Sequence, residues 1–254
     1  MHTHRFADRL RAAGIHLALS LLIAALAALV VFGLWYPAAY GQISGGRQLF
    51  VLLVSVDAVM GPLITLAVFD RRKPLRTLRR DLVVVALLQL SALAYGLWTV
   101  SVARPVHLVF EFDRFRVVHA IEVPDELIGQ EPAGIVALPW TGPTLLAVRP
   151  FKNGNENFDA TMAALSGIPL SARPDLWQPY EAALPRVLNA ARPIEQLKAR
   201  FPARAAEIDA ALAEAGSSAD AARYLPLAGR RAFWTVLLDA RSGAVLAYLD
   251  FDSF

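Results

Sequence analysis

The stretch from Ile15 to Tyr36, IHLALSLLIAALAALVVFGLWY, decides the fold class of this chain. A transmembrane helix needs about 20 consecutive apolar residues, so this run is long enough to cross a bilayer. It lies inside a longer segment, Ala12 to Gly46, that contains no charged residue. A secretory signal peptide is the alternative, but its apolar region has only roughly 7 to 15 residues. The run therefore favours a membrane span.

Two further apolar runs follow the first one. We place the three predicted spans at about 15–36, 49–69 and 82–102; Asp57 is the only charged residue in the second span, and the third has none. The 254-residue chain is 56% hydrophobic and 19% charged, which is too apolar for an ordinary soluble protein. The sequence therefore predicts a three-span α-helical membrane domain over residues 1–103.

The distribution of charge predicts the orientation. Residues 1–103 contain 10 of the 25 basic and 4 of the 22 acidic side chains, which gives a net charge of +6. Residues 104–254 contain the other 15 basic and 18 acidic side chains, which gives a net charge of −3. The basic residues gather before the first span and in the loop DRRKPLRTLRRD, Asp70 to Asp81. The positive-inside rule then predicts a protein of the bacterial inner membrane, with its N-terminus in the cytoplasm and residues 104–254 in the periplasm. A lipid-binding patch is the alternative function of the basic loop. No nucleic-acid partner is expected.

Residues 104–254 are long enough for one independent core. Alternating and aromatic-rich runs predict strands at 106–112, 115–121, 144–148, 233–238 and 244–251. Helical spacing predicts helices at 157–166, 174–188 and 193–215, the last divided by Pro202. Gly243 is expected to take a positive φ in the last turn. Strands at both ends with helices between them predict a periplasmic α+β domain.

The chain lacks the sequence signatures of catalytic and metal sites. It has no cysteine, and it contains no HExxH, GxSxG, P-loop or GxGxxG string. The segment NGNENFD, Asn153 to Asp159, lacks the glycine of a calcium loop, so we predict a helix cap there instead. His107 and His119 are expected to be exposed on strands. We therefore predict a binding module without catalytic residues, metal or cofactor.

Asp57 is the candidate functional residue of the membrane part, because an intramembrane carboxylate is costly and faces the bundle interior or a wet cavity. Asp57, Gly61 and Thr65 recur at every fourth position and form one polar stripe. Pro62 removes a backbone hydrogen bond beside them. Three roles stay open for Asp57: a hydrogen-bonded pin of the bundle, part of a proton or ion path, or recognition of a partner helix.

The third span carries a comparable stripe. Ser91, Tyr95 and Thr99 are also four residues apart, and Tyr95 lies at the same estimated depth as Asp57. We expect the two stripes to face each other, with the Tyr95 hydroxyl donating to Asp57.

Three strings resemble one known family. They are LLVSVDAVMGPLITLAVFD from Leu52, DLVVVALLQLSALAYGLWTVSVARPVHLVFEFDRFRVV from Asp81, and PLAGRRAFWTVLLDARSGAVLAYLDFD from Pro226. Together they resemble the type IV pilin accessory proteins, the TfpX/TfpZ family. The resemblance extends over the three spans and the outer domain, and is weakest in the central helices.

The resemblance implies an inner-membrane, chaperone-like, non-catalytic factor whose partners are a type IV pilin and the pilus assembly machinery. Pilins have a single membrane helix with an acidic residue near its start. We expect the polar face around Asp57 to receive that helix near its N-terminal amine, and the outer domain to contact the pilin head. The alternative is a membrane-anchored periplasmic sensor or regulatory subunit that acts through a partner.

Two further pairs of residues are candidates for the outer contact. Arg104 is expected to anchor at the headgroup level, and Pro105 to end the third span and begin the first strand. This joint is either a fixed linker or the element that sets the tilt of the outer domain. Arg114 and Phe115 are either a turn with an anchored aromatic ring or part of a binding edge, and we favour the turn.

Overall fold

The structure, a computed structural model, describes residues 2–254, with side chains from residue 6 onward. It divides into two compact units. The helical unit comprises the chain up to Pro37 together with Gly46–Ala103. The sheet unit comprises Ala38–Gly45 together with Arg104–Phe254. The short segment Ala38–Gly45, which lies within the predicted membrane domain 1–103, therefore belongs to the sheet unit.

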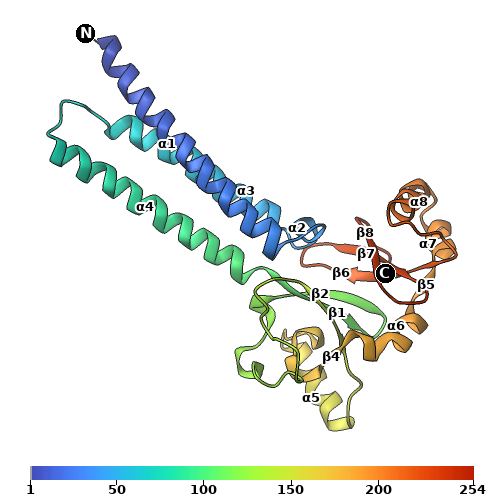
Figure 1. The fold of residues 1–254 in the computed structure, drawn as a ribbon. Coiled ribbons are helices and arrows are strands. Elements are labelled where there is room, and N and C mark those ends of the chain that lie inside the picture. The colour runs from blue at the N-terminus through green and yellow to red at the C-terminus, as the bar shows by residue number, and fades with distance from the viewer. Residues whose placement is uncertain (1) are drawn as a thin grey trace. The chain divides into compact units, whose positions relative to one another are not determined.

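The helical unit contains three long helices (Figure 1). They are α1 (His2–Val30), which continues into the π-helical turn η1 (Val31–Trp35), α3 (Gly46–Val68) and α4 (Leu75–Val102). All three are long and apolar enough to cross a membrane, as the sequence predicted. Helix α4 begins before the predicted span because the arginine- and leucine-rich stretch ahead of it consists of good helix formers.

Helix α3 lies between the other two helices. It packs against both α1 and α4, whereas α1 and α4 hardly touch each other in the part of the chain that the structure describes (Figure 1). One end of the unit is closed by a cluster that includes Val31, Trp35 and Phe50. There the Tyr36 hydroxyl donates to the Val100 carbonyl at 3.0 Å. The three helices are therefore held together at the ends that are joined along the chain to segments of the sheet unit.

The sheet unit contains one mixed sheet of eight strands. The order is β4-β3-β1-β2-β6-β7-β8, with β5 paired to β6. Two neighbouring pairs, β1 with β3 and β2 with β6, are parallel, and the others are antiparallel. The strands are β1 (Pro105–Glu111), β2 (Arg114–His119), β3 (Thr144–Val148), β4 (Trp177–Pro179), β5 (Arg192–Pro193), β6 (Ala222–Ala228), β7 (Phe233–Asp239) and β8 (Val245–Leu249).

The strands predicted from the sequence are confirmed. The first hairpin is β1–β2, the third predicted strand is β3, and the C-terminal hairpin is β7–β8. The last hairpin turns at Gly243, which has φ +68°. The Asp239 carboxylate accepts hydrogen bonds from the backbone N–H groups of Arg241 and Ser242, and these bonds lower the pKa of Asp239. Strands β4, β5 and β6 were not predicted.

The helices of the sheet unit are short. They are α2 (Tyr40–Ile43), η2 (Ala120–Glu122), η3 (Asp125–Leu127), α5 (Gly154–Leu165), η4 (Leu170–Ala172), η5 (Pro174–Leu176), η6 (Tyr180–Ala183), α6 (Leu184–Ala190), α7 (Ile194–Arg200), η7 (Pro202–Arg204) and α8 (Ala205–Glu214). The division at Pro202 is confirmed. The helix predicted over 174–188 is wrong, because Pro179 cannot donate a helical hydrogen bond and the chain instead forms β4.

Helices cover both faces of the sheet. One face, with Phe110, Phe115 and Leu227, is buried beneath η6 and α6. The opposite face is buried beneath α5 and η4 at the β3 side and beneath α7 and α8 at the β8 side (Figure 1). The segment Ala38–Gly45 joins the first of these cores through Tyr40 and Ile43, which are 7% and 1% exposed. The loop after the first helix therefore contributes to the core of the sheet unit.

Candidate functional site

Polar side chains of the helical unit gather where α1 and α4 separate. Helix α3 contributes Asp57, Gly61 and Thr65 from the predicted stripe, and Gly61 and Thr65 are buried there. Helix α1 contributes His16, whose Nδ1 lies 2.6 Å from the Thr65 hydroxyl oxygen. His16 was not among the candidate residues that the sequence indicated.

A cavity of about 200 Å³ lies beside Asp57. Its walls come from all three helices: His16, Ser20 and Ile23 from α1, Asp57 from α3, and Ala86, Gln89, Leu90 and Leu93 from α4. A Cβ atom added at Gly61 would collide with the amide group of Gln89 and approach His16 Nε2 to 3.0 Å. Glycine therefore allows α1 and α4 to bring two polar side chains against α3.

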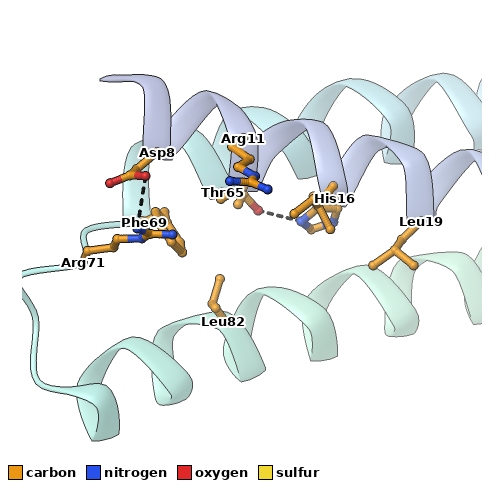
Figure 2. A pocket seen from close by; sticks show the side chains of 10 residues that line it. Asp8, Arg11, His16, Leu19, Thr65, Phe69, Arg71 and Leu82 are labelled. Carbon is orange, nitrogen blue, oxygen red and sulfur yellow. Dashed lines mark hydrogen bonds and ion pairs between the residues drawn. The ribbon is translucent and has the colours of Figure 1, made fainter. Parts of the chain in front are cut away.

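A second, larger cavity of about 590 Å³ lies nearer the N-terminal end of α1 (Figure 2). Its lining includes Ile15, Leu19 and Leu82 and the charged residues Asp8, Arg11 and Arg71. Arg71 and Asp8 form an ion pair of 3.3 Å across it. His16 lines both cavities. We call the two cavities together the α1–α4 groove. The smaller cavity contains the polar residues Asp57, His16 and Gln89, and the larger one contains the charged residues Asp8, Arg11 and Arg71.

The predicted partner of Asp57 on the third span was wrong. Tyr95 is 68% exposed, and its ring packs against Trp98 with 5.7 Å between the ring centroids. Ser91 is exposed as well. Gln89, and not Tyr95, lines the cavity beside Asp57. The two residues are six apart, so on a helix with 3.6 residues per turn their side chains point about 120° away from each other. The stripe of Ser91 and Tyr95 therefore faces away from α3.

Pro62 lies inside α3 next to the groove. It has no backbone N–H, so the carbonyl of Ala58, one turn earlier, loses its helical donor. This carbonyl adds an acceptor close to Asp57. The groove itself offers a carboxylate, an imidazole and an amide, which can hydrogen-bond or pair with a polar group on an entering helix.

The candidate residues of the sheet unit have structural roles. Pro105 begins β1 as predicted. Arg104 is 9% exposed and donates to the Pro139 carbonyl at 3.2 Å, so its side chain is held by the loop before β3. Its anchoring at the headgroup level stays a prediction. Phe115 is fully buried in the core, which agrees with a turn that has an anchored aromatic ring and leaves Phe115 unable to contact a partner. Arg114 pairs with Asp113 at 2.8 Å and stays at the surface.

The two histidines expected to be exposed are fully buried. His107 Nδ1 lies 2.6 Å from the Thr144 hydroxyl, its Nε2 lies 2.9 Å from the Ala137 carbonyl, and its ring packs against Trp177. Burial lowers the pKa of His107 to about 4. His119 Nδ1 lies 3.0 Å from a carboxylate oxygen of Glu122. Sequence reasoning missed the burial of His107 because its ring contacts Thr144, Ala137 and Trp177, which are distant in the chain.

The predicted cap in NGNENFD is confirmed. The Asn153 side chain accepts a hydrogen bond from the Glu156 backbone N–H at 2.9 Å, as the N-cap of α5. Glu156 forms a two-bonded ion pair with Arg149, and these hydrogen bonds lower the pKa of Glu156 to about 2. Among the described residues, no group of three His, Asp or Glu side chains is placed to hold a metal ion.

Comparison with known proteins identifies the family. A family described as "Fimbrial assembly protein FimB" matches residues 4–45. The chain is 34% identical to "Fimbrial assembly protein, serogroup I" of Dichelobacter nodosus, over 100% of this chain and 99% of that protein. It is 32% identical, with the same coverage, to the serogroup E1 protein of that organism. No solved structure matches the chain significantly. Because the similarity to these relatives spans the full length, the chain belongs to the FimB family of fimbrial assembly proteins.

Proposed function

We propose that this protein is an inner-membrane accessory factor, chaperone-like and non-catalytic, that binds a type IV pilin and promotes pilus assembly or pilin stability. The observation that carries the proposal is the α1–α4 groove, a polar opening between apolar helices, in a chain that belongs to a family of fimbrial assembly proteins. This agrees with the resemblance to the TfpX/TfpZ proteins described above.

The chain connectivity supports the proposed topology, with the N-terminus in the cytoplasm and the sheet unit in the periplasm. If α1, α3 and α4 each cross the membrane, the segment after α1 and the segment after α4 emerge on the same side. Ala38–Gly45 and Arg104–Phe254 do form one compact unit. The basic loop between α3 and α4 then lies on the cytoplasmic side, as the positive-inside rule requires.

The proposed occupant of the groove is the membrane helix of the pilin. In a hydrocarbon environment a polar group on a helix is stabilised by partners on neighbouring helices. A pilin carries an acidic residue and an amine near the start of its helix, which would lie at the cytoplasmic end of the groove. We expect His16 and Arg11 to interact with the acidic residue of the pilin, and Asp57 to interact with its N-terminal amine. The two cavities, which share His16, extend the recognition site from Asp57 toward the end where a pilin N-terminus would be.

The sheet unit is proposed to contact the globular head of the same pilin. Arg114 is the exposed member of the predicted outer contact, with its guanidinium 5.0 Å from the Phe254 ring. Pro105 and Arg104 act in this proposal by fixing the first strand directly after α4. Two weak contacts carried by one chain gain affinity through effective concentration.

Replacement of Asp57 tests the proposal. Asp57→Asn keeps the shape of the side chain and removes its charge, so we expect surface piliation to fall sharply while the protein stays abundant in the membrane. Gly61→Leu should also reduce piliation, because its side chain would collide with the amide group of Gln89, which lines the cavity beside Asp57. The matched control is Gly14→Leu in α1, where an added Cβ meets no atom within 4 Å. Normal piliation in both groove variants would remove the proposal.

A further inference from the structure

The outer loop between η3 and β3 exposes an apolar face. The chain has no charged residue from Pro132 to Val148. Val136, Leu138 and Trp140 are 63%, 36% and 63% exposed, whereas Ala137 between them is only 3% exposed. Surface segments that alternate in this way normally turn polar side chains outward. Here three successive outward positions are apolar, and the last is tryptophan.

The backbone of this loop is held by the first strand. Since burial lowers the pKa of His107 to about 4, its ring is neutral near pH 7, and its Nε2–H donates to the Ala137 carbonyl at 2.9 Å. Arg104 donates to the Pro139 carbonyl at 3.2 Å, and its guanidinium lies 5.6 Å from the centre of the Trp140 ring. Two side chains at the start of β1 therefore fix the direction in which the apolar face points.

The same strand follows directly on the third long helix. Helix α4 ends at Val102, and Arg104 is two residues farther on. Because consecutive Cα atoms are about 3.8 Å apart, the backbone of Arg104 stays within about 8 Å of the helix end. Trp140 is stacked on Arg104, so one arginine side chain and two backbone steps connect its ring to the end of α4, the level at which the helix is proposed to leave the bilayer. Tryptophan is enriched at that level because its ring is amphipathic.

We propose that Val136, Leu138 and Trp140 form an interfacial anchor that inserts into the outer leaflet of the bilayer crossed by α4. The occupant of this surface is lipid, which suits an apolar face in a charge-free segment ending in tryptophan. The anchor and the chain connection at Arg104 together restrict the tilt of the sheet unit toward the membrane. This inference rests on the proposed membrane insertion of α4, which a separate probe tests.

The chain contains no cysteine, so single cysteine variants can carry a fluorescent label without background. The full-length Leu138→Cys variant is labelled with an environment-sensitive nitrobenzoxadiazole group and reconstituted into vesicles of phosphatidylethanolamine and phosphatidylglycerol. Leu165→Cys, on α5 and 78% exposed, is the matched control outside the anchor. Leu88→Cys, on α4 and 63% exposed, reports membrane insertion.

The label at position 138 should emit at shorter wavelength than the label at 165. Lipids that carry a spin label near the headgroup should also quench it severalfold more strongly. If the labels at 138 and 165 had the same emission wavelength and the same quenching while the label at 88 was quenched, the anchor would be overturned. The membrane insertion of α4 would then still be supported. A blue shift at 138 without quenching by lipid would also overturn it, since the label would then face protein. Absence of quenching at 88 would refute the membrane insertion on which the anchor depends.

Discussion

The hydroxyl groups of Tyr40 and Tyr248 lie 2.6 Å apart, although 208 positions separate the two residues. Their rings pack edge to face, with centroids 5.4 Å apart. Tyr40 comes from the segment between the first two long helices, and Tyr248 from β8. This contact ties an eight-residue loop into the sheet unit. The loop is therefore a structural part of a domain that begins, along the chain, at Arg104.

This relationship predicts the effect of mutations in the loop. Ile43→Ala should lower the free energy of unfolding of the sheet unit by about 2 to 5 kcal/mol, because it leaves a cavity in a core where Ile43 is 1% exposed. Chemical unfolding of the full-length protein, followed by tryptophan fluorescence, measures the change. Gln42→Ala is the control, since Gln42 is exposed. Equal stability of the two variants would show that the loop is dispensable for the core.

The stability of the sheet unit should depend on pH through His107. The pKa of His107 is about 4 in the folded protein, below its ordinary value of 6.5. Between these values the unfolded chain binds a proton that the folded chain does not, so the free energy of unfolding falls as the pH falls. The loss should reach about 3 kcal/mol near pH 4.

Urea unfolding between pH 7 and pH 4 measures this dependence. The His107→Gln variant should be less stable at pH 7, because Gln cannot reproduce both hydrogen bonds of the ring, to Thr144 and Ala137. It should also lack the part of the pH dependence that His107 contributes. The same slope in both proteins would contradict a buried, neutral His107.

The N-cap of α5 gives a third prediction. Asn153→Ala should cost about 1 kcal/mol, because the backbone N–H of Glu156 loses its acceptor. Asn155→Ala, two residues farther along and exposed, should change stability by less than about 0.5 kcal/mol. The two free energies of unfolding are compared in the same denaturant titration. A larger loss in Asn155→Ala would place the cap elsewhere.

The orientation of α4 gives a fourth prediction. Gln89→Leu should reduce piliation severalfold, because it removes a polar wall of the cavity beside Asp57. Tyr95→Phe should leave piliation unchanged, since the Tyr95 side chain faces outward and packs against Trp98. Counting surface pili in a complemented deletion strain measures both variants. The opposite ranking would mean that Tyr95, and not Gln89, faces the functional partner.

The sequence predicted features that are contained within a short stretch of chain. The three long helices follow from uninterrupted apolar runs, and the β7–β8 hairpin follows from a turn whose own residues, Asp239 and Gly243, stabilise it. The polar stripe on α3 was also placed correctly, because Gly61 and Thr65 are buried. Such features depend on local spacing and local hydrogen bonds, which a single sequence displays.

Features that depend on distant neighbours were missed. Helical spacing shows which residues share a face, but it does not show which face meets another helix, so Tyr95 was chosen in place of Gln89. Strand β6 was missed because Pro226 lies within it. On one side of β6, β5 pairs with residues before Pro226 and β2 with residues after it, so neither of these two ladders includes the proline.

Site-specific photocrosslinking in native membranes tests whether a pilin helix occupies the α1–α4 groove. A benzophenone amino acid replaces Leu90, which lines the cavity beside Asp57, or Leu88, which is 63% exposed on α4 and lies outside that cavity. We expect a pilin adduct from position 90 and little or none from position 88. Equal adducts from both positions, or a position-90 adduct with a protein other than a pilin, would contradict it.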